Sequence, residues 1–514
     1  MGIGGESSCE GVALMAPHSG LAPLHEASSA FAQSKDIDRV RQLLVQSQAA
    51  MSGGQWKEAH DGFLQAAHLL PQAAQVHHNL ALCQLALGQS ELAQQSAQRA
   101  LGLNPQLWQS CLVLGNALKD MKQAEAADAA YAQVLQTQPD NGEALLARAD
   151  LAINVFGLPL QAMSWVLPLL RDKVHAVDAQ LTTLMANVYD RDVSAAVLTQ
   201  AVMKFSKQNL RMNARTNEKL NRLKLLPRTA REQKTKRPRV ALISPLFCAS
   251  PVYFLTISGW RHVAKGCDIV VFNRGHKTDW ATEHFKELCT EWYDVQEMPA
   301  ENLALQIHAA DIDVLYELGG WMDPVALKAL SIKPARQMFK WVGGQSLTTG
   351  LESFDGWIGD EWQSPLNLQH LYTEPLVNVP GGYASYTPPP YMPSVPLQKL
   401  GQPVIFSNPA KLSRAFLAWL AKVPGNIVFV HQQFQYERSR HKVIQALGKN
   451  KVQFICPSSH REALQVLGRF EWMIDTFPYS SGLTAREANA LGVKVKVFTG
   501  ELFCERHSLH LSAR

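Results

Sequence analysis

A period of 34 residues in the first third of the chain constrains its fold more than any other feature of the sequence. Two residue types return at this spacing, alanine and then proline: Ala59, Ala93 and Ala127; Pro71, Pro105 and Pro139. A fixed period of this length indicates that each repeat is one structural unit, which buries its apolar face by stacking on its neighbours. We therefore expect a solenoid in this part of the chain.

Two further positions in the same register indicate how such a unit packs. One holds small residues and the other is aromatic in two repeats of three: Ser47, Ala81 and Gly115; Phe63, Ala97 and Tyr131. This is the pattern of tetratricopeptide repeats, in which small residues let the first helix touch the second and proline ends the second helix. An imperfect fourth copy covers residues 141–170, and helical sequence to about Phe205 is expected to cap the stack.

A solenoid of this kind presents a concave surface suited to an extended peptide. Asn79 and Asn116 lie on first helices, where they either bond a peptide backbone or are plain surface polar residues. His77 and His78 are expected in packing or at the surface, because no third metal ligand lies nearby. The predicted solenoid covers residues 36–203, after a flexible segment over residues 1–35.

Positive charge is concentrated in one segment. Residues 204–239 hold 13 Lys and Arg against two acids, a charge of +11, so the rest of the +5 chain carries −6 (5 − 11). A nucleic-acid binder would spread its basic residues over a folded face, so nucleic acid is not the expected partner. The segment over residues 204–238 is predicted to be a solvated basic helix and linker. Contact with an acidic partner or RNA is the alternative.

Composition excludes several classes of protein. The chain of 514 residues is 46% hydrophobic and 18% charged, which is typical of globular proteins. It has no run of about 18 apolar residues, so no membrane span is expected, and it lacks the pattern of a secretory signal. Eight cysteines contain no CxxC pair, which argues against a zinc ribbon or a redox motif. We expect a cytoplasmic protein with mostly buried thiols.

From Arg239 onward, short β-rich runs alternate with helical patterns. The predicted strands cover residues 240–244, 269–272, 314–317, 404–407, 427–430, 452–455, 472–475 and 495–498. Short apolar runs between helices are typical of buried parallel strands. A Pro-rich stretch over residues 387–396 divides the region into two doubly wound halves, 239–395 and 396–514. Ligands of such folds lie at the carboxyl ends of the strands.

One segment fits that rule best. The predicted strand ending at Asp475 leads into a turn with proline, two serines and Gly482, and then into a helix over residues 485–491. Glycine allows close backbone approach, and free amides at a helix start can hold phosphate. Glu487, one turn into this helix, could accept hydrogen bonds from ribose hydroxyls. A structural loop capped by Ser and Thr is the alternative.

Lys411 is a second candidate, just after the predicted strand over residues 404–407. A lysine that leads into a helix beside a strand end can neutralise a diphosphate leaving group. The alternative is an ordinary surface lysine. Asp311 and Asp313 superficially form a metal-binding DxD, but they open a predicted strand, so no metal site is predicted there.

Taken together, these segments resemble the family 41 glycosyltransferases, the protein O-linked N-acetylglucosamine transferases and their bacterial relatives. The segment from Asp475 to Glu487 looks like the family's nucleotide-diphosphate loop, and the one from Phe406 to Lys411 looks like the segment of its essential lysine. The resemblance covers the chain from about Asp36. It implies tetratricopeptide repeats followed by two Rossmann-like halves of the GT-B type, an acceptor half and a UDP-sugar half.

The resemblance also implies a reaction without a metal ion or other cofactor. A sugar, N-acetylglucosamine, would pass from a UDP-sugar to Ser or Thr of a protein held by the repeats, or to Asn in some relatives. Lys411 would be catalytic and Glu487 would hold the ribose. The other donor-side residues are Gly482, Leu483 and Thr484 at the diphosphate, Asn408 and Trp321 at the sugar, and His460 at the base.

The chain departs from the family on the acceptor side. Ser250 stands where the family usually has a histidine, and Gln345 lies in a loop that replaces a Gly-Tyr-Pro-Gly type; both are acceptor-side candidates. The sequence given ends at Arg514, soon after the last family motif, which predicts a second half truncated at its C-terminus. The alternative function is a catalytically degenerate repeat scaffold with a vestigial or UDP-sensing GT-B module.

Overall fold

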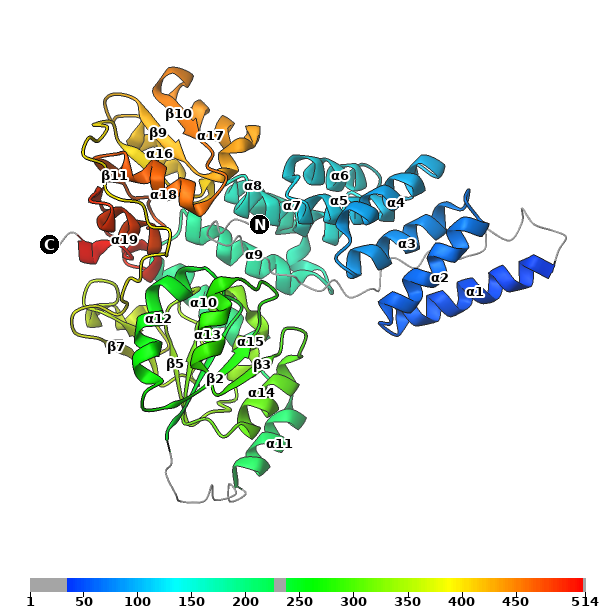
Figure 1. Cartoon of the computed structure of the whole chain (residues 1–514), viewed down its shortest axis with the longest axis horizontal. Coiled ribbons are helices and arrows are strands. Elements are labelled where there is room, and N and C mark those ends of the chain that lie inside the picture. Colours follow the sequence, from blue (N-terminus) through cyan, green and yellow to red (C-terminus); the bar gives the residue numbers. More distant parts are fainter. Residues whose placement is uncertain (1–34, 226–236, 512–514) are drawn as a thin grey trace. The chain divides into compact units, whose positions relative to one another are not determined.

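The computed structural model describes residues 35–225 and 237–511 and falls into two compact units (Figure 1). The smaller contains the described residues up to Ile153 and Gln161–Thr182, and the larger contains Asn154–Leu160 and the chain from Thr183 onward. The predicted flexible segment over residues 1–35 lies, except for Lys35, outside the described residues. So does the stretch 226–236 of the predicted basic linker.

Successive helices of the smaller unit pack in pairs, as the 34-residue period predicts. They are α1 (Lys35–Ser52), α2 (Trp56–Leu69), α3 (Ala74–Ala86), α4 (Ser90–Leu103), α5 (Trp108–Asp120), α6 (Ala124–Thr137) and α7 (Gly142–Asn154). Helix α8 (Pro159–Val166), the 3₁₀ segment η2 (Leu167–Arg171) and α9 (Ala176–Tyr189) continue the chain. The helical pairs α1–α2, α3–α4 and α5–α6 make the closest contacts, which confirms the repeat array.

Side chains at the repeat positions pack as expected. Phe63 and Tyr131 are fully buried, and a Cβ atom at Gly115 would lie 2.4 Å from the Tyr131 ring. The small residue therefore lets an aromatic ring lie directly on the first helix. The Tyr131 hydroxyl donates to Asn116 Oδ1 (2.7 Å), and Asn79 is 3% exposed, so Asn79 is not the surface polar residue that one interpretation expected.

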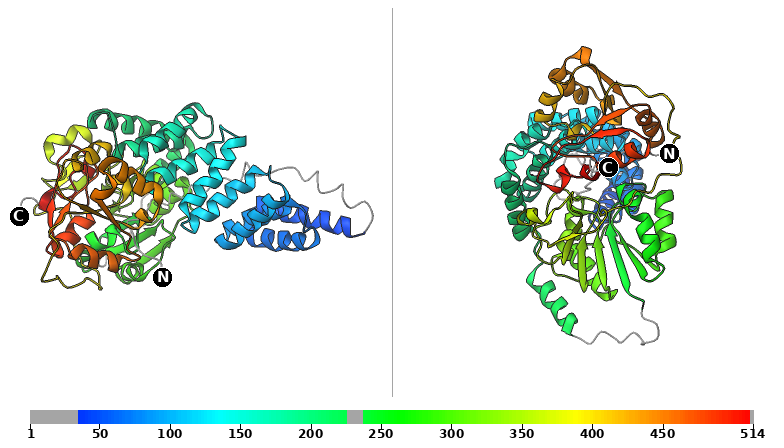
Figure 2. Two further views of the ribbon diagram at one scale, coloured as in Figure 1. Left: turned by 90° about the horizontal axis from the view of Figure 1, so that it is seen from above. Right: turned by 90° about the vertical axis from the view of Figure 1, so that its left-hand side faces the viewer.

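The first sheet of the larger unit has seven parallel strands in the order β3-β2-β1-β4-β5-β6-β7, seen as green arrows in Figure 2. They are β1 (Arg239–Ser244), β2 (Asp268–Asn273), β3 (Glu291–Asp294), β4 (Val314–Glu317), β5 (Gln337–Lys340), β6 (Gly356–Gly359) and β7 (Leu376–Asn378). The strand order reverses between β1 and β4, which is where an open α/β sheet forms a crevice.

The second sheet has five parallel strands in the order β10-β9-β8-β11-β12. They are β8 (Val404–Phe406), β9 (Ile427–Val430), β10 (Val452–Ile455), β11 (Trp472–Ile474) and β12 (Lys494–Lys496). Each was predicted to within two residues at either end, and the order reverses between β8 and β11. The predicted fold class, repeats followed by two Rossmann-like halves, is therefore confirmed.

Two helices of the larger unit precede β1, and the others lie between strands along the chain. They are α10 (Ala195–Asn209), α11 (Ala214–Leu225), α12 (Pro251–Val263), α13 (Trp280–Leu288), α14 (Ala300–Ala309), α15 (Pro324–Leu330), α16 (Arg414–Leu420), α17 (Glu437–Leu447), α18 (His460–Gly468) and α19 (Leu483–Ala490). Of the described basic residues in this segment, Lys204 and Lys207 lie on α10, Arg211 lies between the two helices, and Arg215, Lys219, Arg222 and Lys224 lie on α11. Helix α19 begins two residues earlier than predicted.

The loop Asn154–Leu160 packs against the second half of the larger unit. Its backbone carbonyls accept hydrogen bonds from side chains: Asn154 from Gln433 (2.7 Å) and Asn408 (3.4 Å), Val155 from Ser439 (3.1 Å), and Gly157 from Lys442. Gly157 has φ +69°, and a Cβ atom there would lie 2.4 Å from the Pro409 carbonyl oxygen. Glycine is therefore required at this one position of the loop.

The seven cysteines of the described residues are free, and four of them are buried. Among residues 35–225 and 237–511, no helix combines the length and the apolar character that crossing a membrane requires. A cytoplasmic location stays a prediction.

Candidate functional site

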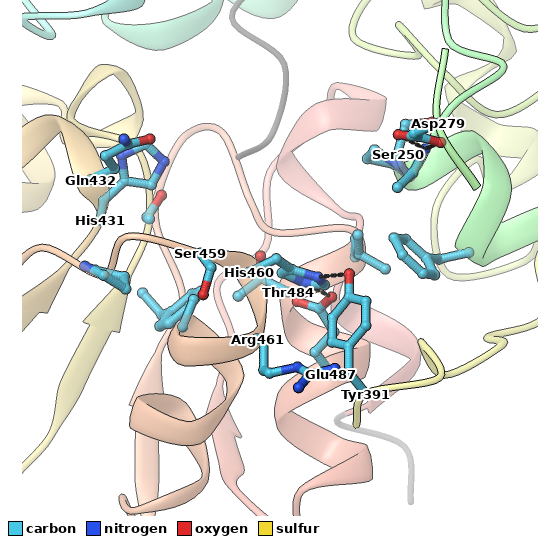
Figure 3. A pocket seen from close by; sticks show the side chains of 18 of the residues that line it. Ser250, Asp279, Tyr391, His431, Gln432, Ser459, His460, Arg461, Thr484 and Glu487 are labelled. Carbon is cyan, nitrogen blue, oxygen red and sulfur yellow. Dashed lines mark hydrogen bonds and ion pairs between the residues drawn. The ribbon is translucent and has the colours of Figure 1, made fainter. Parts of the chain in front are cut away.

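A cavity of about 440 Å³ lies at the carboxyl ends of the strands of the larger unit (Figure 3). Both halves line it. The first half contributes Ala249, Ser250, Pro251, Phe254, Asp279 and Trp280, and the Pro-rich stretch between the halves contributes Tyr391. The second half contributes Phe406, Ser407, His431, Gln432, Pro457, Ser459, His460, Arg461, Ala463, Leu483, Thr484 and Glu487. Apart from Tyr391, these residues lie at or after the carboxyl ends of six strands, so the cavity lies where doubly wound sheets bind ligands.

Besides α13, which Asp279 caps, three helices start at this cavity. Helix α12 begins after Ser250, α18 after Ser459, and α19 after Gly482. Ser459 accepts from the Glu462 amide (3.1 Å), while the Ser250 hydroxyl donates to the Leu246 carbonyl (2.8 Å). Unpaired amides and the positive end of the helix dipole favour negative charge at such positions. The cavity is therefore suited to an anionic ligand.

Asp279 fixes the wall of the first half. Its carboxylate accepts from the Ala249 amide (3.0 Å) and from the Ala281 amide (3.0 Å), and it forms a capping box with Thr282 at the start of α13. The Thr282 hydroxyl in turn donates to the Phe247 carbonyl (2.7 Å). The loop after β1 is thus tied to the start of α13. Asp279 was not among the predicted site residues, although an Asp just before a helical pattern is a recognisable N-cap signal.

Three side chains form a hydrogen-bonded chain across the floor of the cavity (Figure 3). His460 Nδ1 lies 2.9 Å from the Tyr391 hydroxyl, and His460 Nε2 lies 2.8 Å from Glu487 Oε1. The Arg461 guanidinium lies 5.4 Å from the centre of the Tyr391 ring. Burial, with the nearby Glu487 charge, raises the pKa of Tyr391 to about 12, so the phenol stays protonated at neutral pH.

His460, Glu487 and Thr484 were predicted to share a site, and the structure brings them together. Tyr391 was missed, because its Pro-rich segment was interpreted only as a linker. Leu483 and Ser250 also line the cavity. Gly482, directly before Leu483 in the chain, is the N-cap of α19.

Asp475 holds the turn before α19 through hydrogen bonds. Its Oδ1 atom accepts from the Thr476 amide (2.8 Å) and the Ser481 amide (2.9 Å), and its Oδ2 atom accepts from the Ser508 hydroxyl. Asp475 is fully buried, and burial raises the pKa of its carboxyl group. Asp475 therefore shapes the turn and does not face the cavity.

Lys411 and Asn408 lie on the neighbouring turn after β8, outside the cavity lining. Lys411 is 9% exposed, and its ammonium lies 4.8 Å from the centre of the Tyr479 ring. Asn408 caps the turn by accepting from the Ala410 amide (2.8 Å) and donates to the Asn154 carbonyl. In this structure Asn408 positions the segment that carries Lys411.

Trp321 and Gln345 lie elsewhere in the first half. The Trp321 indole donates to the Thr348 carbonyl (3.0 Å) and packs on Phe205, with ring centres 5.8 Å apart. Gln345 donates to the Ile358 carbonyl (3.1 Å). Both side chains are buried and neither is among the residues that line the cavity, so their expected roles at the sugar and on the acceptor side stay predictions.

Asp311 and Asp313 both pair with Arg336, at 2.9 Å and 2.6 Å. Within the described ranges, no group of three or more His, Cys, Asp or Glu side chains could hold a metal ion.

Comparison with known proteins agrees with this architecture. The model of the tetratricopeptide repeat family matches residues 74–107 and 109–141. A probable UDP-N-acetylglucosamine–peptide N-acetylglucosaminyltransferase, SPINDLY of Eustoma exaltatum subsp. russellianum, is 25% identical over 261 residues, 47% of this chain and 28% of the relative. The probable enzyme of the same activity named SEC, of Arabidopsis thaliana, is 26% identical over 156 residues, 30% of this chain and 16% of the relative.

A solved structure matches almost the whole chain. A variant of the Thermobaculum terrenum O-GlcNAc transferase aligns with a TM-score of 0.59 and 18% identity, covering 94% of this chain and 86% of that one. The chain is similar to the family 41 glycosyltransferases. The likeness to this family 41 structure is one of fold, and the matched parts span less than a third of the length of the two plant relatives.

Proposed function

We propose that the protein is a glycosyltransferase that moves N-acetylglucosamine from UDP-N-acetylglucosamine to Ser or Thr of a protein recruited by the repeats. The observation that carries the proposal is the cavity between two parallel sheets, where three helix N-termini meet a buried Glu487 and its partner His460. The activities for which SPINDLY and SEC are named support the same reaction.

The reaction breaks the bond between the anomeric carbon and the oxygen of the β-phosphate and forms one from that carbon to the acceptor oxygen. The acceptor hydroxyl loses its proton, and negative charge develops on the departing UDP. In the proposal, Lys411 and the first amides of α19 stabilise that charge in a site with little water. Glu487 and His460 hold the ribose, and no metal ion takes part; retention of turnover in excess chelator tests the last point.

The repeats would supply the acceptor. A tetratricopeptide array suits an extended protein segment, and its fixed geometry would hold many acceptors by their backbone. The acceptor protein is therefore proposed as a class, a Ser- or Thr-bearing segment, with no nucleic acid involved.

Calorimetric titration of UDP and UDP-N-acetylglucosamine into the wild type and Lys411→Ala tests the proposal. A charge-assisted hydrogen bond contributes about 1.5–3 kcal/mol, so loss of the lysine should weaken binding of both ligands at least about tenfold. Lys422→Ala, which removes an exposed lysine after α16, is the matched control and should bind like the wild type. If the wild type binds neither ligand at millimolar concentration, the enzyme proposal fails and the repeats are better studied as a scaffold.

A further inference from the structure

His507 lies against the start of helix α19, beside the expected diphosphate position. A Cβ atom built on Gly482, the N-cap of this helix, would meet only His507 within 4 Å apart from its chain neighbours, at 3.8 Å from the Cγ atom. The imidazole therefore borders the first amides of this helix. The segment that carries His507 follows β12, and its next residue, Ser508, bonds Asp475, which holds the turn before α19.

The backbone and the ring of His507 are both fixed. The His507 amide donates to the Ser480 hydroxyl oxygen (2.9 Å), and its carbonyl accepts from Gln363 (3.0 Å). The ring packs between Phe503 and Tyr479, with ring centres 5.2 Å and 5.9 Å away. Tyr479 is also the ring that lies next to the Lys411 ammonium, so Lys411 and His507 share one neighbour.

The polar atoms around this ring are not all satisfied. His507 is 9% exposed, and its Nδ1 atom has no hydrogen-bond partner in the part of the chain that the structure describes. The same holds for Arg486 Nε, one turn into α19. A buried polar atom without a partner costs about 1–3 kcal/mol, so two of them at one helix start indicate a missing partner.

The charge state of the imidazole indicates what that partner is. Burial, together with the nearby Lys411, Arg486 and His510, lowers the pKa of His507 to about 3, so the ring is neutral at pH 7. A neutral imidazole still carries one N–H donor. A lysine, an arginine, a helix start and this donor together match an anion with several oxygen atoms.

We propose that His507 donates a hydrogen bond to the diphosphate of the nucleotide-sugar donor, together with Lys411, Arg486 and the first amides of α19. This inference rests on the proposed function and names a further residue of the same site. His507 forms no covalent bond in the reaction. It binds the phosphate oxygens and stabilises the charge that gathers on UDP as the sugar departs.

The test uses the full chain and two ligands that differ only in the diphosphate, uridine and UDP. His507→Phe keeps a ring between Phe503 and Tyr479 but removes both nitrogen atoms, and His507→Gln restores a donor. We expect His507→Phe to bind UDP about tenfold more weakly than the wild type, with uridine affinity changed less than about twofold. His507→Gln should recover part of the loss. Calorimetry measures UDP and ligand-observed NMR titration measures uridine.

His370→Gln, in the exposed 3₁₀ segment over Leu366–Leu371, is the matched control and should leave both affinities unchanged. Unaltered UDP binding by a folded His507→Phe overturns the inference, and so does an equal loss of uridine and UDP, which would mean a purely structural role. If the wild type binds no UDP, the proposed function itself fails, so the two failures are distinct.

Discussion

His460 Nε2 lies 2.8 Å from Glu487 Oε1, so the carboxylate proposed to hold the ribose is already bonded to an imidazole. The other ring nitrogen faces the Tyr391 hydroxyl at 2.9 Å. A bound ribose must therefore share the Glu487 carboxylate with His460, and His460 fixes the direction of that carboxylate. Tyr391 comes from the Pro-rich stretch between the halves, His460 from α18 and Glu487 from α19, so ribose binding involves all three segments.

Glu487→Gln should weaken the binding of all uridine-containing ligands by a similar factor. Glutamine keeps the size of the side chain but removes its charge, and a hydrogen bond to a charged group contributes about 1.5–3 kcal/mol. We expect uridine, UMP and UDP to lose affinity by a similar factor, about tenfold, in parallel titrations. Glu471→Gln removes a carboxylate from a surface ion pair with Lys494 and is the control. A loss confined to UDP would contradict the ribose assignment, because that is the pattern expected of Lys411→Ala.

Gly115→Ala should destabilise the repeat array. The added Cβ atom would lie 2.4 Å from the Tyr131 ring, which is fully buried and cannot move away freely. Overpacking of this kind costs about 1–3 kcal/mol. The free energy of unfolding, measured by urea denaturation with circular dichroism, should fall by this amount.

Gly102→Ala provides the opposite case on α4, since its added Cβ atom would meet nothing within 4 Å. This variant should gain about 0.5–1 kcal/mol, because alanine favours the helix over glycine. Equal effects of the two variants would mean that the close helix contact at Gly115 does not control stability.

Lys442→Met should change how stability depends on pH. Burial lowers the pKa of Lys442 from 10.5 to about 8, so between these values the unfolded chain binds a proton that the folded chain has lost. The free energy of unfolding of the wild type therefore gains from this group as the pH rises through that window, and the penalty of the buried charge is fully present below it. Methionine removes the titrating ammonium group and with it this pH dependence.

Urea denaturation from pH 7 to pH 10 measures the effect. The stability of Lys442→Met relative to the wild type should be greatest at pH 7 and should fall as the pH rises above 8, by at most about 1.4 kcal/mol per pH unit. The exposed Lys422→Met serves as the control, with a difference from the wild type that stays constant. A constant difference for Lys442→Met would contradict the prediction.

Most of the fold could be predicted because its signals are local. The repeat period and the apolar strand runs depend on residues close in sequence. Strands β3, β5, β6 and β7 were missed because they carry little apolar signal: β3 begins and ends with acids, β6 with glycines, and β7 has three residues at the sheet edge. Strand β5 ends at Lys340, a fully buried lysine paired with Glu317 (3.0 Å), which only the tertiary structure makes possible.

The candidate site divides in the same way. Glu487 and Thr484 follow a recognisable strand, turn and helix, and they line the cavity. Tyr391 and His507 could not be predicted from the sequence. Tyr391 bonds a residue 69 positions away, and His507 lies next to Gly482 only in the folded chain. The Trp321 indole donates to the Thr348 carbonyl, a contact that no sequence motif signals.

The loop Asn154–Leu160 is held through its backbone carbonyls, which every amino acid possesses. The donors all lie on the other side of the contact, at Asn408, Gln433, Ser439 and Lys442. Mutations that accumulate in the loop over evolution can therefore leave these bonds intact, except at Gly157, where a side chain has no room, and at Phe156, whose fully buried ring packs on Tyr436. The donors lack this freedom, so in a set of related sequences we expect the rest of the loop to diverge while Phe156, Gly157 and the four donor residues are retained.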